Sequence, residues 1–307
     1  MSLENKIENR CYIVNPSSQG GKAEEIWETE IKPLIKSDKH VYFTEKDKTT
    51  ELVKKIADKY DVFVCVGGDG TAMDIANAIV DKDKKLAKLP LGSGNDVDLS
   101  LGLIKSNDDK AFGKLLDIID RGRIKEIDVC KAYFENKETL YLANSNIGLS
   151  AEVLRQLRLE SKNSQGASSY QNTLLKILFF QNYKPFETEI KFNGNTINEK
   201  CLIMAVNNMR STGGGMLITP NAKFDDGYLD FFYAGNLSKI ECVIALTKVR
   251  KGTHIGQNKI VYYDGASRIT SVEINTNPKV YFGLDGEVTG TTPAKFEIYE
   301  KKLKVIC

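Results

Sequence analysis

Three glycine-rich segments carry residues that could do chemistry on a phosphate. The first is "GGDGT" (residues 67–71), which follows the apolar run "VFVCV" and precedes an apolar pattern with helical spacing. Glycines let a backbone approach phosphates, and the next helix N-terminus offers unpaired N–H groups and a positive dipole end. Asp69 would repel a phosphate unless it carries a cation or orients the attacking hydroxyl. The alternative is a turn-forming aspartate that caps the helix, and spacing alone leaves both open.

Two further turns have the same character. "NPSSQGG" (residues 15–21) and "LPLGSGND" (residues 89–96) each follow a short apolar run and are rich in Gly, Ser, Asn and Asp. In an open parallel sheet the loops at the carboxyl ends of the strands meet at one crevice. The three loops therefore predict one nucleotide site. This part of the chain contains neither a GxxxxGK[ST] P-loop nor a GxGxxG fingerprint.

Two acidic turns lie late in the chain. "LDGE" (residues 284–287) offers Asp285 and Glu287, and "AKFDDGY" (residues 222–228) offers Asp225 and Asp226. A positioned carboxylate can accept the proton of an attacking hydroxyl, but Asp-Gly is also a strong hairpin signal, which the residues alone favour. Adjacent carboxylates repel each other, and a cation would relieve this. A plain acidic turn is the alternative for the second segment.

The elements that position these turns change character near residue 124. Before it, strand-like runs such as "CYIVNP", "HVYFTE" and "VFVCV" alternate with helical patterns, including one over residues 20–35. This alternation predicts parallel βαβ units in a doubly wound sheet. After it, short strand-like runs separated by Gly, Asn or Asp predict a β-rich sandwich or barrel-like sheet. Two helices are expected within that part, at roughly 171–181 and 238–251.

Composition indicates a soluble globular chain without a strong field. The 307 residues are 41% hydrophobic and 27% charged, with 43 basic and 41 acidic side chains. A net charge of +2 argues against nucleic acid as a partner. The polar start predicts no signal peptide, and the apolar cluster "LLKILFF" is far below the ~20 residues that span a bilayer. The six cysteines form no CxxC or His/Cys cluster, so we expect a reducing cytoplasm.

The motifs together resemble the diacylglycerol kinase catalytic-domain family. "NPSSQGG", "GGDGT" and "PLGSGND" match in order and spacing, and the match continues with "GGGMLITPNAKFDDGYLD" (residues 213–230), "VRKGTHIG" and "LDGE". GGDGT alone also occurs in NAD kinases. The later motifs are more specific to the lipid kinases, which include soluble bacterial enzymes and sphingosine and ceramide kinases.

The resemblance implies a fold and an ATP site. The fold would be α/β plus β-rich: a three-layer α/β domain of phosphofructokinase and NAD-kinase type (residues 1–128), and a β-sandwich-like lipid-substrate domain (residues 129–292). A tail from about 293 to 307 would pack back on the first domain, and the active site would lie in the interdomain cleft. The residues expected around ATP are Asn15, Pro16, Ser17, Ser18, Gln19, Thr44, Gly67, Gly68, Asp69, Gly70, Thr71, Ala72, Met73, Ser93 and Asn95.

The same resemblance assigns catalytic and metal roles. Asp285 and Glu287 are the candidates for general base, with Asp285 slightly favoured, and Asp69 would manage Mg²⁺ and the transferring phosphoryl group. A structural Mg²⁺ would be held by the Asp226 carboxylate and the backbone oxygens of Lys223 and Tyr228. Carbonyls, one carboxylate and waters suit magnesium.

The implied activity is ATP-dependent phosphorylation of a lipid hydroxyl, most readily diacylglycerol to phosphatidic acid. The expected protein is cytoplasmic and touches the membrane only transiently and peripherally, because its substrate is lipid while the chain has no anchor. A homodimer is left open. The alternatives are an NAD kinase-like enzyme and a catalytically silent nucleotide- or lipid-binding regulator. Two departures from the family pattern, Met73 and Ser150, concern nucleotide holding and acceptor identity.

Overall fold

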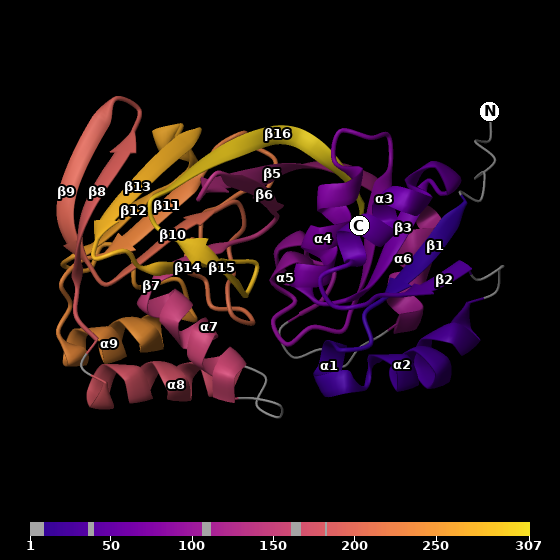
Figure 1. Ribbon diagram of the computed structural model, residues 1–307, viewed down its shortest axis with the longest axis horizontal. Coiled ribbons are helices and arrows are strands. Elements are labelled where there is room, and N and C mark those ends of the chain that lie inside the picture. The colour runs from indigo at the N-terminus through magenta and orange to yellow at the C-terminus, as the bar shows by residue number, and fades with distance from the viewer. Residues whose placement is uncertain (1–8, 36–39, 106–111, 161–166, 182) are drawn as a thin grey trace. The chain divides into compact units, whose positions relative to one another are not determined.

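The computed structural model describes residues 9–35, 40–105, 112–160, 167–181 and 183–307 (Figure 1). The chain divides into two units. Unit 1 comprises Met1–Ile127 with Lys301–Cys307, and unit 2 comprises Asp128–Glu300. Each unit is described by itself below.

A parallel sheet forms the centre of unit 1. Strands β1 (Arg10–Val14), β2 (His40–Phe43), β3 (Val62–Gly67) and β4 (Lys85–Pro90) lie in the order β2-β1-β3-β4. Lys304 and Val305, at the end of β16 (Ala294–Ile306), extend the sheet parallel to β4. Every residue of β3 is buried, as expected for a strand covered on both faces. The predicted α/β architecture is confirmed.

Helices pack on this sheet. α3 (Thr49–Ile56) contacts α4 (Asp69–Ile79), and α4 packs on β3. α6 (Phe112–Arg121) packs on β4, and its Leu115 shares a core with Trp27. The short helix α5 (Asp96–Leu101) follows the turn after β4.

The single helix expected over residues 20–35 is wrong. This segment contains the short helices α1 (Ser18–Gly21) and α2 (Ala23–Ile26), a π-helical turn (Trp27–Ile31) and a 3₁₀ turn (Lys32–Leu34). Gln19 and Gly20 have φ values of 54° and 68°, which break the right-handed helix before α2. Trp27, which begins the π-helical turn, is nevertheless buried.

Unit 2 contains antiparallel sheets. A six-stranded sheet has the order β12-β11-β10-β7-β14-β15. Its strands are β7 (Ser145–Gly148), β10 (Ile203–Asn207), β11 (Asp230–Ala234), β12 (Ile260–Tyr263), β14 (Tyr281–Leu284) and β15 (Glu287–Thr291). This sheet and a second antiparallel layer, described next, form the β-sandwich-like architecture predicted for this half.

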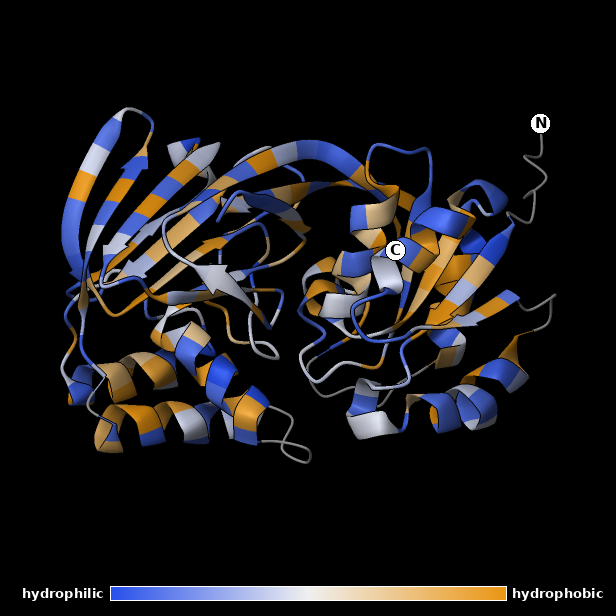
Figure 2. Cartoon of the chain, in the orientation of Figure 1, coloured by the Kyte–Doolittle hydropathy of each residue, from blue (hydrophilic) through white to orange (hydrophobic). Residues whose placement is uncertain are grey.

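The second layer of unit 2 contains β13 (Ser271–Asn277), β8 (Phe186–Phe192) and β9 (Asn195–Cys201). The strand order is β16-β13-β8-β9. β5 (Ile124–Phe134) pairs with β16 and β6 (Lys137–Tyr141). Burial alternates along β8 and β13, and Figure 2 shows the matching alternation of hydropathy. One face of each strand is therefore buried and the other is solvated.

Three helices of unit 2 lie together beside the six-stranded sheet (Figure 1). They are α7 (Leu149–Glu160), α8 (Ala167–Phe180) and α9 (Lys239–Val249). α8 and α9 correspond to the two expected helices, whereas α7 was not predicted. A capping box between Ser238 and Glu241 starts α9. The three helices share a core that includes Leu149, Ile177 and Cys242.

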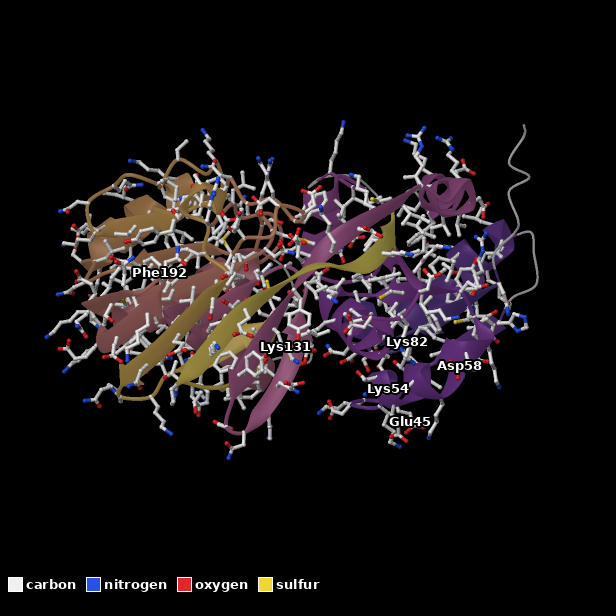
Figure 3. All side chains as sticks on the ribbon, turned by 90° about the horizontal axis from the view of Figure 1, so that it is seen from above. Glu45, Lys54, Asp58, Lys82, Lys131 and Phe192 are labelled. Carbon is white, nitrogen blue, oxygen red and sulfur yellow. The ribbon has the colours of Figure 1, made fainter. Side chains whose placement is uncertain are left out.

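The surface of unit 1 carries exposed charged side chains of both signs. Figure 3 shows Lys54, Asp58 and Lys82 on its outside. Among the described residues, no helix has the length and apolar character needed to cross a membrane.

Candidate active site

The structure brings the three predicted loops of unit 1 into contact. Asn15 Nδ2 donates a hydrogen bond to Thr71 Oγ1 at 2.9 Å, which joins the turns after β1 and β3. Gln19 Nε2 reaches the carbonyl oxygen of Gly92 at 3.5 Å, which joins the turns after β1 and β4. The loops therefore form one surface at the carboxyl ends of the parallel strands, where α/β sheets bind ligands.

The second and third loops touch backbone to backbone. A Cβ at Gly92 would lie 2.7 Å from the Gly68 Cα, and a Cβ at Gly68 would lie 3.1 Å from the Gly92 Cα. Only residues without side chains permit this approach. Asn95, at φ 52°, closes the third loop because its side chain accepts from the Gly92 N–H at 2.9 Å and donates to the Gly92 carbonyl at 3.0 Å.

Asp69 lies in the first turn of α4 and is buried. Its Oδ1 accepts from Lys88 Nζ at 2.5 Å and its Oδ2 accepts from the Asp96 backbone N–H at 2.6 Å. The cap residue of α4 is Gly68, which makes no side-chain cap bond. Asp69 thus faces a lysine ammonium and the first amides of α5, and it fixes the second glycine turn against the third.

Lys88 lies between two carboxylates. Its Nζ is also 2.7 Å from Asp98 Oδ2, and the side chains of Lys88 and Asp98 are fully buried. Burial lowers the pKa of Lys88, but Asp69 and Asp98 outweigh burial and hold this pKa above its ordinary value. Burial raises the pKa of Asp98 to about 6, against the attraction of Lys88. We call Asp69, Lys88 and Asp98 the buried triad.

The other residues expected around ATP differ in exposure. Ser17 and Ser93 are exposed within their loops, whereas Ala72 is fully buried in the body of α4. Thr44 is buried at the end of β2, and its N–H donates to the Val14 carbonyl beside Asn15. Of the remaining members, Pro16 follows β1, Ser18 begins α1, Gly67 ends β3, and Gly70 and Met73 lie in α4.

Asp285 of unit 2 occupies the tight turn between β14 and β15. Asp285 and Gly286 have φ values of 45° and 86°, the positive pair that a two-residue hairpin favours. The Asp285 carboxylate is buried and accepts backbone N–H groups from Leu142 (2.7 Å), Ala143 (2.9 Å) and Asn144 (3.1 Å). Glu287 is exposed at the start of β15. The two interpretations of Asp285 from the sequence, a catalytic carboxylate and a hairpin-turn residue, are therefore compatible. The residue forms the turn, and the turn holds its carboxylate in place.

Asn144 connects this carboxylate to a pocket. Its backbone N–H donates to Asp285, while its Oδ1 accepts from Asn146 Nδ2 at 3.0 Å and from Thr212 Oγ1 at 3.1 Å. Asn146 and Thr212 both line the pocket. Polar groups thus lead from the Asp285 turn to the pocket wall.

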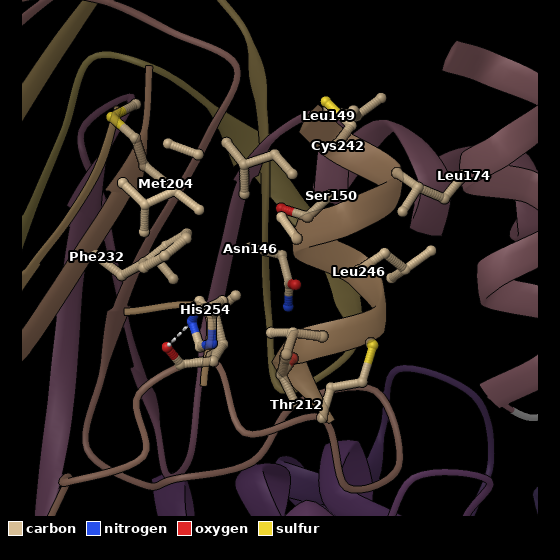
Figure 4. Close-up of a pocket in the computed structure, with 18 of the residues that line it drawn as sticks. Asn146, Leu149, Ser150, Leu174, Met204, Thr212, Phe232, Cys242, Leu246 and His254 are labelled. Carbon is tan, nitrogen blue, oxygen red and sulfur yellow. Dashed lines mark hydrogen bonds between the residues drawn. The ribbon is translucent and has the colours of Figure 1, made fainter. Parts of the chain in front are cut away.

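The pocket itself is almost entirely apolar (Figure 4). It is a cavity of about 90 Å³ between the six-stranded sheet and the helices of unit 2. Leu174 and Leu178 of α8 line it, together with Cys242, Ala245 and Leu246 of α9 and Phe232 of β11. Within the apolar cluster "LLKILFF", Leu174 and Leu178 line this cavity, whereas Phe179 is exposed.

The "DDG" turn is anchored by a residue that sequence analysis missed. Asp128 accepts the Gly227 N–H at 2.8 Å through Oδ2, and its own N–H donates to the Phe224 carbonyl at 2.7 Å. Asp226 Oδ1 accepts from the Tyr228 N–H at 3.1 Å. The exposed Lys223 lies at the start of the same turn.

The surroundings of this turn are negative. Burial raises the pKa of Asp226, and repulsion from Asp225 adds to the shift, against the hydrogen bond from Tyr228. Burial also raises the pKa of Asp230 to about 7, and Asp230 Oδ2 is a buried atom with no hydrogen-bond partner among the described residues. Among all residues that the structure describes, no three His, Cys, Asp or Glu side chains are grouped so that they could hold a metal ion. A cation here would therefore depend on one carboxylate with carbonyls and waters, a donor set that fits Mg²⁺.

Several residues of these sites were absent from the sequence predictions: Lys88, Asp98, Asp128, Asn144 and Thr212. Lys88 gave a weak signal, since it is a charged residue between the apolar Ala87 and Leu89 of the strand "KLAKLP". The others gave none, because their partners are distant in sequence.

Comparisons with known proteins agree with this architecture. Residues 10–132 match the family model described as the diacylglycerol kinase catalytic domain, and residues 145–307 match the YegS C-terminal NAD kinase beta sandwich-like domain. A diacylglycerol kinase of Staphylococcus aureus (strain JH9) is 28% identical over 303 residues, covering 95% of this chain and 90% of that protein.

Solved structures show the same fold. A diacylglycerol kinase structure from Bacillus anthracis str. Sterne has a TM-score of 0.67 at 21% identity, covering 98% of this chain and 97% of that one. Another structure from the same organism has a TM-score of 0.76 at 24% identity with the same coverage.

Proposed function

Because this chain belongs to the diacylglycerol kinase catalytic-domain family and is a lipid kinase, we propose that it transfers the γ-phosphoryl group of ATP to the free hydroxyl of a diacylglycerol. The observation that carries the proposal is the apolar pocket of unit 2, whose polar wall leads through Asn144 to the buried Asp285 carboxylate. An acyl chain requires apolar lining, and phosphoryl transfer to a hydroxyl requires a nearby carboxylate. The names of the relatives support the choice of acceptor.

The three loops of unit 1 hold ATP in this proposal. The glycines of the second and third loops allow the backbone to approach the phosphates, and the N-terminus of α4 supplies N–H donors. Ser17 and Ser93 offer exposed hydroxyls. Asp69 orients the second loop through its contacts with Lys88 and the Asp96 amide, in addition to its predicted role toward Mg²⁺.

Asp285 acts as the general base in this proposal. Its carboxylate is fixed by three backbone N–H groups, and a carboxylate positioned in this way can accept the proton of a lipid hydroxyl. Glu287 is exposed, so we assign it the lesser role.

An exposed apolar surface of unit 2 supports a transient peripheral contact with the membrane. Phe179 and Phe180 end α8, and Ile240 and Ile244 lie on α9; their exposed fractions are 45%, 85%, 71% and 45%. Lys239 Nζ donates to the Phe179 carbonyl at 3.3 Å, so the two helix ends are neighbours. Apolar residues beside a lysine suit the interface of an anionic bilayer. The same surface would also serve a homodimer, which stays a prediction.

The direct experiment is phosphate transfer from γ-labelled ATP with Mg²⁺. The acceptors are diacylglycerol, monoacylglycerol, phosphatidylglycerol, sphingosine and ceramide in mixed micelles, with NAD in a parallel tube. We expect label in diacylglycerol. Label in NAD alone would favour the NAD kinase-like alternative, and protein that binds ATP but labels no acceptor would contradict the proposal.

The "DDG" turn gives a separate prediction for Mg²⁺. We propose that the Asp226 carboxylate and the Lys223 and Tyr228 carbonyl oxygens hold a structural Mg²⁺, whose positive charge offsets the surrounding carboxylates. A ligand that binds only the folded state stabilises it, by about 2.7 kcal/mol at 100 times its dissociation constant. Mg²⁺ should therefore raise the melting temperature of unit 2, followed by circular dichroism, and EDTA should reverse the rise.

The matched variants are Asp226→Asn and Asp225→Asn. Asp225 is the exposed neighbour in the same turn, so its variant should keep most of the Mg²⁺ response while Asp226→Asn should lose it. An equal response in the two variants would rule out this ligand set.

A further inference from the structure

The pocket of unit 2 is lined by a buried polar atom whose bonding is incomplete. Among the polar side chains of the lining are Ser145, Asn146, Ser150, Thr212 and His254. The first four all bond within the protein. Ser145 Oγ accepts from the Val206 N–H, Ser150 Oγ donates to the Ile147 carbonyl, and Asn146 and Thr212 donate to Asn144. His254 Nδ1 is buried and has no hydrogen-bond partner among the described residues.

The protein fixes the tautomer of His254. Its Nε2 lies 3.1 Å from the Ile218 carbonyl oxygen, and a carbonyl only accepts, so Nε2 carries the hydrogen. The side chain is 1% exposed, and burial lowers the pKa of the imidazole, which keeps it neutral near pH 7. Nδ1 is then a bare acceptor. Figure 4 shows the His254 ring within the pocket, with the Phe232 ring at a centroid distance of 5.5 Å.

An unpaired acceptor in an apolar cavity favours a ligand that brings a donor. Leaving a buried acceptor without a donor is unfavourable, and a site built around such an atom discriminates strongly against ligands lacking the matching group. We propose that His254 Nδ1 accepts a hydrogen bond from a hydroxyl or amide N–H on the buried part of the acceptor lipid, a group other than the hydroxyl that is phosphorylated.

This inference rests on the proposed lipid kinase activity and extends its acceptors beyond diacylglycerol. A diacylglycerol has one hydroxyl, the group that reacts, and its two esters only accept hydrogen bonds. A monoacylglycerol has a second hydroxyl, and an N-acylated amino alcohol has an amide N–H. Lipids with such a second donor should therefore be better acceptors than matched lipids without it.

The first test observes the nitrogen directly. The chain has two histidines, His40 and His254, so protein labelled with ¹⁵N-histidine gives a spectrum that His40→Gln assigns. Adding 1-oleoylglycerol in micelles should shift the His254 Nδ1 resonance from that of a bare acceptor toward that of a hydrogen-bonded one. An Nδ1 resonance that is already hydrogen-bonded without lipid, and does not move when lipid is added, would mean that water fills this place and would overturn the proposal.

The second test compares two lipids that differ in one group. 1-Oleoylglycerol and the mono-oleoyl ester of propane-1,3-diol have the same chain and primary hydroxyl, but the ester lacks the second hydroxyl. One neutral hydrogen bond corresponds to roughly a two- to tenfold preference, so kcat/KM should favour 1-oleoylglycerol by that factor. Equal kcat/KM values in the unmodified protein would overturn the proposal.

Two variants test the roles of the two ring nitrogens of His254 separately. His254→Asn places an amide oxygen near the Nδ1 position and should retain the preference. His254→Gln reaches toward the Ile218 carbonyl as Nε2 does but puts a methylene in place of Nδ1, and its preference should fall toward one. The control Ala245→Phe narrows the pocket from α9 and should lower kcat/KM for both lipids alike.

The results of these experiments also distinguish failure of the His254 role from failure of the proposed kinase function. If diacylglycerol is phosphorylated and the preference is the same in all variants, the role of His254 is wrong and the kinase proposal stands. If no lipid is phosphorylated, the proposed function fails, and the nitrogen spectrum alone decides whether His254 receives a donor from bound lipid.

Discussion

Replacing Lys88 with methionine should lower the free energy of unfolding by roughly 3–5 kcal/mol, the usual cost of removing one partner from a buried ion pair. Lys88 Nζ lies 2.5 Å from Asp69 Oδ1 and 2.7 Å from Asp98 Oδ2, and the lysine side chain is fully buried. Without the ammonium, two carboxylates would face each other in the core. Trp27 is the only tryptophan and lies buried in unit 1, so urea unfolding followed by its fluorescence measures the change.

Lys84→Met is the matched control. The Lys84 side chain is 18% exposed and lies 3.4 Å from the 53% exposed Asp61, and a pair with an exposed partner at this distance contributes about 0–1 kcal/mol. The double variant Lys88→Met with Asp98→Leu should recover much of the lost stability because it removes one of the two unpaired carboxylates. Similar losses in Lys84→Met and Lys88→Met would refute the importance of the buried triad.

The Lys88→Met effect should also depend on pH. Burial raises the folded-state pKa of Asp98 and Lys88 lowers it, so removing Lys88 should raise this pKa further above that of the unfolded chain. An acid with a raised folded pKa gains stability as the pH falls through that pKa. The penalty for losing Lys88 should therefore be smaller at pH 5 than at pH 8.

Asp285→Asn should lower kcat by about 10²- to 10⁴-fold, the usual contribution of a general base. The Asn oxygen can replace Oδ1 toward Ala143 and Asn144, whereas the Leu142 N–H loses its partner because it binds Oδ2. Glu287→Gln changes an exposed side chain two residues away and should leave kcat within a few-fold of the original. The measurement is initial-rate phosphorylation of diacylglycerol over a range of pH.

A fold control belongs with this comparison. Loss of the Leu142 bond costs stability, so melting of both variants must be measured beside activity. If Glu287→Gln loses the rate and Asp285→Asn keeps it, the general base is Glu287. A folded Asp285→Asn protein with near-full kcat would remove Asp285 from the chemistry.

The strands and loops of unit 1 could largely be predicted from local sequence patterns, whereas the buried triad could not. The run "VFVCV" predicts β3, and the glycine turns predict where the loops converge, because both depend on neighbouring residues. The buried triad depends on Asp69 reaching Lys88, 19 residues on. A contact of this kind is set by the register of parallel strands, which a single sequence does not display.

Unit 2 shows a similar division. The short strands were predicted, whereas α7 was not, although Leu149, Val153 and Leu157 recur at helical spacing. The pattern is weakened by Leu159, which is 71% exposed. The Asp285 contacts span 141 to 143 residues, so only a resemblance to known proteins pointed to this carboxylate.

The sequence order of unit 1 has a consequence for synthesis. Its sheet is completed by Lys304 and Val305, which pair with Lys85 and Leu86 of β4, while Asp128–Glu300 form unit 2. Until Lys304 and Val305 have been synthesised, β4 has an unpaired edge, although its residues are almost all buried in the folded unit. Unit 2, being one continuous stretch, can finish folding first, and a chain cut after Glu300 would leave an unpaired, aggregation-prone strand edge on unit 1.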